Sequence, residues 1–299
     1  MSKQTILVTG GNGFVGVPLC RFLVGKGHQV ISLSRSAYET RAYESVVGNV
    51  TDPTSIAGAL AGFEFDIVIH LVSMLVSASA KNPGMATRVN TLGTLHLMEY
   101  CAARGVRRFI YGSSYNAMGT QTGYAGPVPE TAPASPSDFY GETKRYCECL
   151  GETMHANKDL EFAATRMSII LGPGTPSPTS AWRTDVFNLL SGGGKIAIPF
   201  HQDEVLPMAH FQDVAEGIAA VALAPTLAHT IYNLPGESMT AGELAAAVRG
   251  RGRGVDVSCG SRLLTGIPHH VDSQRIRTEI GFQPWTLAER MQAFCEEAA

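Results

Sequence analysis

Short apolar runs recur through the first half of the chain, and stretches of helical periodicity separate them. The runs predict strands near residues 4–9, 29–34, 45–50, 66–72, 107–113 and 161–168. Runs that are apolar throughout are typical of strands buried on both faces of a sheet. Strands that alternate with helices predict an α/β fold, here a Rossmann-type doubly wound parallel sheet with right-handed crossovers.

Two long helices are predicted within this alternation, over residues 84–104 and 138–156. The first carries apolar residues at helical spacing, at Val89, Leu92, Leu95, Leu97 and Met98. The second begins after Asp138, and an acidic residue at that point favours a helix N-terminus.

The pattern changes after Arg166, and a Gly/Pro-rich break follows over residues 172–178. Beyond it the pattern predicts helices near 181–191, 213–223, 240–249 and 286–297, and short strands near 195–199 and 231–234. We therefore predict a dinucleotide-binding domain over residues 1–170. Residues 171–299 are predicted to form a smaller substrate-binding lobe, part of which returns to the large sheet.

Composition narrows the classes of function. The chain has 299 residues with a net charge of −3 and 16% charged residues, so neither nucleic acid nor a membrane surface is an expected partner. No apolar run is long enough to span a bilayer, and the first residues lead into a strand rather than a signal peptide. The six cysteines form no CxxC pair, which indicates reduced thiols in the cytoplasm. The nine histidines show no zinc-like spacing, so no metal is expected.

A glycine-rich loop follows the first predicted strand. Gly10, Gly13 and Gly16 stand three residues apart between an apolar run and a stretch of helical spacing. Gly10 is expected to supply an unusual backbone angle, Gly13 to admit a pyrophosphate, and Gly16 to let the helix pack on the strand. The N–H groups and the dipole at the helix start favour phosphate. The loop is typical of a dinucleotide site, although by itself it is also compatible with an ordinary turn.

A tyrosine and a lysine lie four residues apart in the second long helix. Tyr140 and Lys144 therefore share one helix face. The ordinary pKa of a phenol is about 10, and a nearby ammonium is expected to lower it. The pair is typical of proton transfer; the alternative is two exposed residues on a polar face.

Together these motifs resemble the extended short-chain dehydrogenase/reductase family, also called the NAD(P)-dependent epimerase/dehydratases. The resemblance runs nearly from end to end, and the order and number of the motifs make it specific. It rests on Thr9–Gly16 (TGGNGFVG), His70–Ser73 (HLVS), Val89–Thr94 (VNTLGT), Ser113–Gly119 (SSYNAMG), the YxxxK of Tyr140 and Lys144, Gly172–Gly174 (GPG) and His210–Ala215 (HFQDVA).

The resemblance implies roles for individual residues. Tyr140 would exchange the hydroxyl proton, and Lys144 would hold the nicotinamide ribose and tune Tyr140. Ser114 would hydrogen bond to the substrate oxygen, and Asn90 would support the active-site loop and a proton-relay water. The implied substrate contacts are Ser73, Ser114, Asn116, Tyr140 and Arg183. The implied cofactor contacts are Gly10, Asn12, Gly13, Phe14, Val15, Gly16, Ser34, Arg35, Asn49, Val50, Leu71, Val72, Tyr140 and Lys144.

The end of the second predicted strand bears on the choice of cofactor. NAD enzymes of this fold place an acid about 20 residues past the glycine loop, to bind the ribose 2′-hydroxyl. Ser34 stands at that place and Arg35 follows it. Because an arginine can bind a 2′-phosphate, the sequence favours NADP, with NAD as the alternative. The alternative interpretation is that Arg35 has no role in cofactor binding and points into solvent.

The chain departs from the nucleotide-sugar enzymes of the family at two positions. Ile169 stands where they carry a diphosphate-binding asparagine, and Leu206 where they carry an arginine. A desolvated pyrophosphate needs cationic or hydrogen-bonding partners, so these substitutions disfavour a nucleotide-linked substrate. The segment 232–240 looks more like the small-substrate dehydrogenases of the family. Arg183 either clamps a substrate carboxylate or lies on a helix surface.

The sequence therefore predicts an NADP-preferring oxidoreductase that moves a hydride between the cofactor and a secondary alcohol or ketone of a small substrate. One rival is a sugar-nucleotide epimerase that retains its cofactor, and another is a non-catalytic NADP-binding sensor. A homodimer is expected, because the two long helices resemble the family's interface helices. These helices carry more apolar residues than are needed to cover one face of the sheet. The residues in question are Leu97, Met98, Cys101, Leu150 and Met154.

Overall fold

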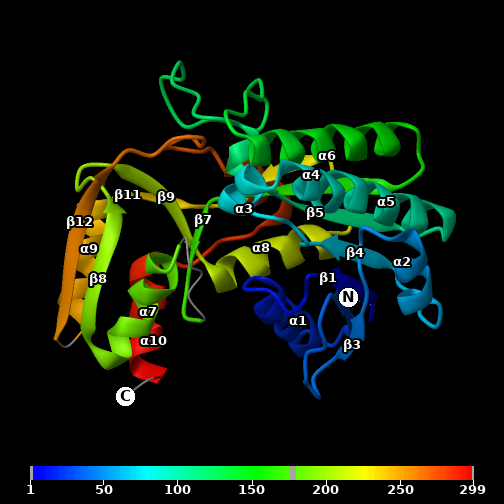
Figure 1. Cartoon of the computed structure of the whole chain (residues 1–299), viewed down its shortest axis with the longest axis horizontal. Coiled ribbons are helices and arrows are strands. Elements are labelled where there is room, and N and C mark those ends of the chain that lie inside the picture. Colours follow the sequence, from blue (N-terminus) through cyan, green and yellow to red (C-terminus); the bar gives the residue numbers. More distant parts are fainter. Residues whose placement is uncertain (1–2, 175–179, 253, 298–299) are drawn as a thin grey trace.

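The computed structural model describes residues 3–174, 180–252 and 254–297, so part of the predicted Gly/Pro-rich break lies outside the described residues. Seven strands form one large sheet (Figure 1). They are β1 (Thr5–Thr9), β2 (Gln29–Ser34), β3 (Glu44–Val47), β4 (Ile67–His70), β5 (Arg108–Ser114), β6 (Glu161–Met167) and β10 (Ile231–Asn233). Their order is β10-β6-β5-β4-β1-β2-β3, and every neighbouring pair is parallel. The predicted Rossmann-type sheet is confirmed.

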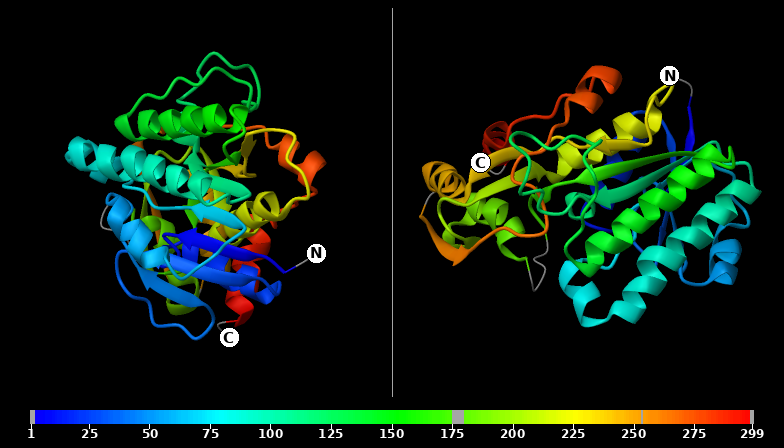
Figure 2. Two further views of the ribbon diagram at one scale, coloured as in Figure 1. Left: turned by 90° about the vertical axis from the view of Figure 1, so that its right-hand side faces the viewer. Right: turned by 90° about the horizontal axis from the view of Figure 1, so that it is seen from above.

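Helices cover both faces of this sheet (Figures 1 and 2). One face packs against α1 (Gly16–Gly25) and α8 (Phe211–Leu223), and the other against α2 (Pro53–Leu60), α5 (Gly93–Ala103) and α6 (Phe139–Ala156). The predicted helix over 84–104 consists of α4 (Pro83–Ala86), a π-helical segment η1 (Thr87–Leu92) and α5, after a short α3 (Val76–Lys81). The sheet therefore lies between two helical layers, with a hydrophobic core on each side.

The C-terminal lobe contains two small sheets. One has the order β11-β9-β7 and the other pairs β12 with β8. Its strands are β7 (Ile169–Leu171), β8 (Gly194–Phe200), β9 (Val205–His210), β11 (Glu237–Thr240) and β12 (Val255–Arg262), and its helices are α7 (Trp182–Gly192), α9 (Ala241–Arg251) and α10 (Leu287–Glu297). The sequence pattern predicted the three helices and β8, and it missed the other four strands.

The chain returns from this lobe to the large sheet. Strand β10 adds to the edge of β6, and α8 packs along α1. Arg108 of β5 fastens α8 to the sheet: its buried guanidinium donates to the carbonyls of Ala222 and Ala224 at the end of that helix, at 2.8 and 2.5 Å. The same guanidinium pairs with Glu161 at 2.8 Å. A cation at a helix C-terminus is favoured by the helix dipole.

Three further observations concern membrane spans, metal sites and cysteines. No helix within the described ranges is long and apolar enough to cross a membrane. Among the residues that the structure describes, no group of three or more His, Cys, Asp or Glu could hold a metal ion. The six cysteines are free.

Candidate active site

The motif residues gather at the carboxyl edge of the large sheet. Gly10 follows β1, Leu71 follows β4 and Ser114 ends β5. In open α/β sheets, ligands bind in the crevice outside the carboxyl ends of the strands. The loops at this edge therefore form the candidate active site.

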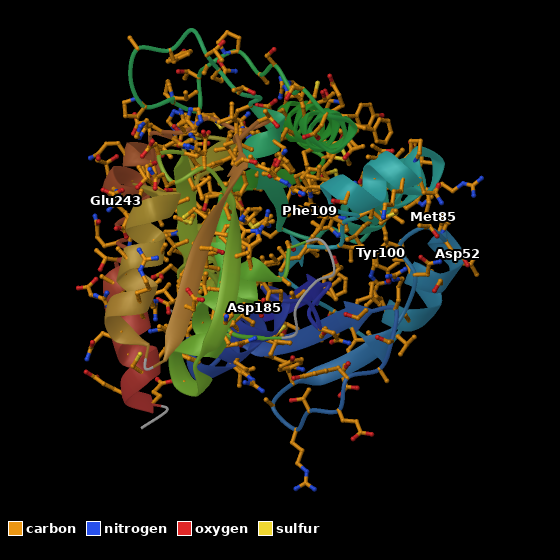
Figure 3. The ribbon with its side chains drawn as sticks, turned by 60° about the vertical axis from the view of Figure 1, so that its left-hand side comes forward. Asp52, Met85, Tyr100, Phe109, Asp185 and Glu243 are labelled. Atoms are coloured by element: carbon orange, nitrogen blue, oxygen red, sulfur yellow. The ribbon has the colours of Figure 1, made fainter. Side chains whose placement is uncertain are left out.

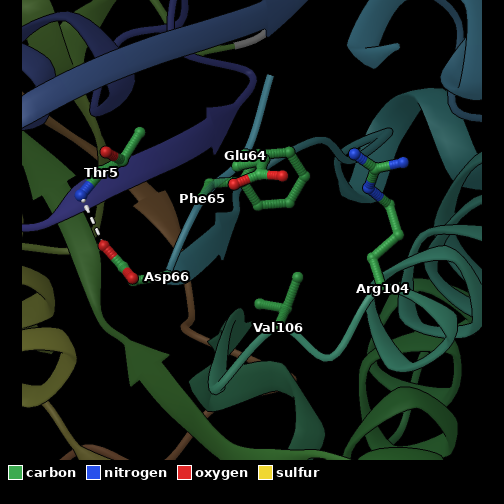
Figure 4. Close-up of a pocket in the computed structure, with 6 residues that line it drawn as sticks. All are labelled: Thr5, Glu64, Phe65, Asp66, Arg104 and Val106. Carbon is green, nitrogen blue, oxygen red and sulfur yellow. Dashed lines mark hydrogen bonds between the residues drawn. The ribbon is translucent and has the colours of Figure 1, made fainter. Parts of the chain in front are cut away.

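A separate cavity of about 540 Å³ lies at the opposite edge of the sheet, near the amino ends of the same strands. Its lining comprises Thr5, Glu64, Phe65, Asp66, Arg104 and Val106 (Figure 4). Asp66 accepts a hydrogen bond from the backbone N–H of Thr5 at 2.8 Å and so joins two strand starts. None of the residues assigned from the sequence motifs lines this cavity, so it is separate from the candidate active site.

The glycine loop forms a cradle that side chains would fill. Gly10 has a φ of +75°, which L side chains rarely adopt. A Cβ on Gly16 would lie 2.2 Å from the carbonyl oxygen of Gly10, and one on Gly11 would lie 2.3 Å from the Oγ of Ser32. The need for glycine at Gly11 was missed in the sequence, since the contact comes from the neighbouring strand. A turn this tight leaves backbone at the start of α1, which fits a dinucleotide pyrophosphate.

Asn12 fastens the loop to β2. Its Oδ1 accepts from the hydroxyl of Ser32 at 3.1 Å, and its Nδ2 donates to the carbonyl of Ser36 at 2.8 Å. Its backbone N–H donates to Ser34 at 3.3 Å. Ser34 is therefore buried beneath the loop, whereas the next side chain, Arg35, is exposed at the end of the strand.

The other assigned cofactor residues border the same edge. Leu71 and Val72 approach Gly10 so closely that a Cβ there would lie 3.2 Å from their backbone atoms. Phe14 stacks on Phe211, with ring centroids 5.3 Å apart. The remaining three are Val15, which precedes α1, and the exposed Asn49 and buried Val50, which follow β3.

The N-terminus of α6 places the Tyr–Lys pair. Asp138 caps the helix by accepting from the N–H of Gly141 at 2.7 Å, as the acidic entry predicted. Tyr140 and Lys144 are both buried on the face turned to the sheet, and the ammonium lies 5.5 Å from the ring centroid of the tyrosine. Lys144 donates to the carbonyl of Gly112 at 2.7 Å. The pair is therefore not exposed on a polar helix face.

Burial dominates the acidity of both groups. It raises the pKa of Tyr140 to about 12, while hydrogen bonds with Ser114 and Ser73 and the charge of Arg183 lower this pKa. The expectation that Lys144 brings the phenol below its ordinary pKa is wrong for this structure, because desolvation of the phenolate outweighs the nearby charges. Burial lowers the pKa of Lys144 to about 8.

Ser114 is held by a chain of hydrogen bonds. Its hydroxyl donates to the Oδ1 of Asn116 at 3.0 Å and accepts from the backbone N–H of Asn116 at 3.2 Å. The Nδ2 of Asn116 donates to Asp138 at 2.8 Å. Because a carboxylate only accepts, Asp138 fixes the orientation of this amide. The structure thus places Asn116, assigned from sequence as a substrate contact, between the candidate catalytic serine and the cap of α6.

Asn90 joins the loop after β4 to α6. Its Oδ1 accepts from the N–H of Met74 at 2.7 Å and from Ser73 at 3.3 Å. Its Nδ2 donates to the carbonyl of Met74 at 3.0 Å and to Thr143 at 3.1 Å. Both the oxygen and the nitrogen of the Asn90 amide therefore have hydrogen-bond partners, and Ser73 is held beside Tyr140.

Arg183 comes to the site from α7. Its charge lowers the pKa of Tyr140, and burial lowers the pKa of Arg183 itself. Its Nε is buried and has no hydrogen-bond partner among the residues that the structure describes, and its guanidinium lies 5.9 Å from the ring of Trp182. Arg183 is therefore not a surface arginine turned to bulk solvent.

Ile169 and Leu206 belong to the hydrophobic core of the lobe. Both are buried among apolar neighbours. Neither can compensate a desolvated diphosphate.

Comparisons with known proteins bear on this site. The model of a family described as "NAD dependent epimerase/dehydratase family" matches residues 6–234. The mitochondrial L-threonine 3-dehydrogenase of Bos taurus is 26% identical over 82% of this chain and 68% of its own length. A UDP-glucose 4-epimerase of Schizosaccharomyces pombe is 29% identical over 59% of this chain and 54% of its own. The chain is thus similar to dehydrogenases and to epimerases.

Solved structures resemble the whole fold. A GalE-like L-threonine dehydrogenase from Cupriavidus necator has a TM-score of 0.90 at 24% identity, covering 99% of this chain and 100% of that one. A monomeric L-threonine 3-dehydrogenase from a metagenome has a TM-score of 0.86 at 21% identity, covering 98% of each chain. At these identities the likeness establishes the fold alone.

Proposed function

We propose a reaction for this chain from one premise: it belongs to the NAD-dependent epimerase/dehydratase family and is an NAD(P)-dependent enzyme. The proposed reaction is hydride transfer between the nicotinamide and a secondary alcohol or ketone of a small substrate that is not nucleotide-linked. A hydroxy acid, a sugar or a sugar acid fits this description. The cofactor would supply or accept the hydride; the protein binds, orients and moves the proton.

Three side chains carry the proposed proton chemistry. Tyr140 exchanges the hydroxyl proton of the substrate, and Ser114 hydrogen bonds to the same oxygen. Lys144 binds the nicotinamide ribose and contributes positive charge beside the phenol. With its raised pKa the phenol is protonated at neutral pH, which is the form that gives a proton to a ketone, whereas the phenolate that would accept a proton from an alcohol is scarce.

Arg183 is the observation that carries the proposed substrate class. Arg183 is half-buried, and its buried Nε has no hydrogen-bond partner among the described residues, which is costly unless a ligand completes its hydrogen bonds. A carboxylate offers two acceptor oxygens that match the guanidinium fork. With Tyr140 beside it, Arg183 supports an acidic substrate whose hydroxyl or ketone lies near the carboxylate.

The alternative is an epimerase that retains its cofactor, since the chain is similar to a UDP-glucose 4-epimerase. The apolar pair Ile169 and Leu206 weighs against a nucleotide sugar. A retained cofactor that co-purifies and a reaction without net redox change would favour the epimerase.

We also propose NADP as the preferred cofactor. Arg35 is exposed at the end of β2, next to the loop that Asn12 anchors, and it makes no hydrogen bond or ion pair within the part of the chain that the structure describes. It is therefore available for a 2′-phosphate. The free cysteines support a reducing, cytoplasmic compartment.

The homodimer remains a proposal, but three of the five residues chosen for it are wrong; the other two, Leu150 and Met154, are only partly buried. Leu97, Met98 and Cys101 are fully buried in the core of their own chain, because they cover the sheet. Other apolar side chains face outward from the same helices, namely Met85, Leu92 and Tyr146. Met85 lies at the outer side of this layer, whereas Phe109 of β5 lies inside (Figure 3). Light scattering at micromolar concentration tests the dimer, and a monomer rejects it.

A substrate screen tests the proposed reaction. The purified chain is incubated with NADP and NAD and with hydroxy acids, sugar acids and sugars, and with the matching ketones and reduced cofactors, while absorbance at 340 nm is followed. We expect turnover with an acidic alcohol–ketone pair and negligible calorimetric binding of UDP or UDP-glucose. Micromolar binding of UDP together with epimerisation of UDP-glucose without a net change in absorbance at 340 nm would overturn the proposal.

A further inference from the structure

Glu148 is a fully buried carboxylate that the proposed proton chemistry does not use. It lies on α6 one turn beyond Lys144, as Lys144 lies one turn beyond Tyr140, so the three side chains share one face. Burial of a carboxylate costs free energy unless charged and hydrogen-bonding partners compensate it. A side chain this costly to bury, beside a candidate catalytic residue, is itself a candidate for function.

Two strands of the sheet hold this carboxylate, and the more exposed Arg145 of α6 lies 3.6 Å from it. Arg166 of β6 donates to it through Nε and Nη2, both at 2.8 Å, and Ser113 of β5 donates at 2.6 Å. Ser113 and Arg166 are directly paired in the sheet. A bidentate guanidinium fixes both oxygens of the carboxylate, so Glu148 has one orientation.

The same contacts fix the position of Lys144. Its ammonium bonds to the carbonyl of Gly112, and Glu148 bonds to the hydroxyl of Ser113, the next residue of β5. Successive turns of α6 are thus fastened to successive residues of the strand that ends in Ser114. The distance between the helix that carries Tyr140 and the strand that carries Ser114 depends on both contacts.

The groups that face Lys144 come from three elements. The ring of Tyr111 on β5 lies 4.7 Å from the ammonium, and the ring of Tyr140 on α6 lies 5.5 Å away. His70 of β4 is neutral, because burial lowers its pKa to about 3. Cys147 and Glu148, both on α6, are the groups whose negative charge favours the ammonium; burial raises the thiol pKa of Cys147, so Glu148 supplies that charge.

We propose that Glu148 is a positioning residue for the cofactor: held by Arg166 and Ser113, it keeps the Lys144 ammonium charged and seated against β5, and so able to bind the nicotinamide ribose. This inference rests on the cofactor role of Lys144 and not on the identity of the substrate.

The test measures affinity for NADH against pH, by fluorescence titration between pH 6 and 10 without substrate. NADH is chosen because it lacks the 2′-phosphate, and such a phosphate titrates near 6. The pKa of Lys144 lies at about 8, so wild-type affinity should fall as the pH rises through that value and the ammonium loses its proton. Glu148→Gln removes the charge and should move this fall about one pH unit lower, leaving affinity roughly fivefold weaker at pH 8 and roughly tenfold weaker at pH 9.

Matched variants separate charge from packing. Arg166→Met removes the nearer of the two opposite charges and leaves Arg145, so the fall should move to higher pH. Ser113→Ala removes a hydrogen bond without charge and should leave the midpoint in place. Lys144→Met should abolish the pH-dependent step. A wild-type midpoint in Glu148→Gln, shifts of the same sign in the Glu148 and Arg166 variants, or a step that survives in Lys144→Met would each overturn the proposal.

A double variant provides a second test in case the single variants do not fold. Glu148→Met with Arg166→Met replaces the buried pair by apolar side chains of similar length, an exchange that proteins often tolerate. Because the two losses shift the midpoint in opposite directions, this variant is read at pH 6, where the Lys144 ammonium is charged. Weaker NADH binding there supports the positioning role, and wild-type affinity at every pH overturns the proposal. Failure of the proposed hydride chemistry would show elsewhere, as absent turnover, since this assay contains no substrate.

Discussion

Replacement of Arg183 by methionine should make the fold more stable and the substrate site weaker. The Nε of Arg183 is buried and finds no partner within the described part of the chain, and burial lowers the pKa of the guanidinium. An unsatisfied buried donor costs about 1–3 kcal/mol. Methionine keeps most of the apolar stem and carries no donor. We therefore expect a gain of about 1–2 kcal/mol, which raises Tm by roughly 2–4 °C per kcal/mol in domains of this order of size.

The same change should weaken the binding of an acidic substrate. A hydrogen bond to a charged group contributes about 1.5–3 kcal/mol, which corresponds to roughly a 10- to 150-fold loss of affinity. The KM for the acid should rise by such a factor, while affinity for the cofactor stays the same. Calorimetric melting and steady-state kinetics measure the two effects on one preparation.

Arg183→Lys is the matched control, since it keeps the charge and removes the buried Nε. It should retain part of the affinity and gain part of the stability. An unchanged KM in Arg183→Met would remove this residue from substrate binding. A lower Tm would show that the guanidinium stabilises the lobe, and the reasoning from its unpartnered nitrogen would be refuted.

Three other substitutions have definite expected outcomes. Tyr140→Phe should retain cofactor affinity and lose about 100- to 10,000-fold in turnover, because the exchanging proton is gone; kinetics near those of wild type would exclude Tyr140 as the proton donor. Arg35→Ala should weaken the binding of NADP about tenfold and leave the binding of NAD unchanged. Titration with both cofactors measures this, and equal losses of affinity would count against the assignment. Gly16→Ala places a Cβ 2.2 Å from a backbone oxygen and should cost about 1–3 kcal/mol together with cofactor binding. Gly25→Ala, at the open end of the same helix, should cost nothing, so equal melting temperatures would refute the steric argument.

The large sheet could be predicted because its strands are buried on both faces. Ile6–Val8 in β1 and Ile67–Ile69 in β4 have no exposed side chains, and such strands are apolar throughout. The strands of the C-terminal lobe do not have this continuous apolar pattern. Most side chains of β12, Val255–Arg262, are at least partly exposed in a two-stranded sheet, and β9 contains Pro207, which the usual rules exclude from a central strand.

The site was predictable as far as local spacing reaches. Tyr140 and Lys144 share a helix face because they are four residues apart, and their burial follows from that face. Glu148 is four residues further on and was missed, although the same spacing placed it there. Its partner Arg166 lies on another strand, and no local pattern pairs the two. The raised pKa of Tyr140 likewise depends on how completely the folded chain excludes water.

The return of the chain to β10 limits how such enzymes can be recombined. A single crossover near residue 170 would separate α8 and β10 from the sheet that they complete. Strand β6 would become an open edge, and Arg108 would lose the helix carbonyls that accept its hydrogen bonds. A new substrate specificity is therefore exchanged by grafting two segments, one between β6 and α8 and one after β10, with the residues between them left in their original sheet.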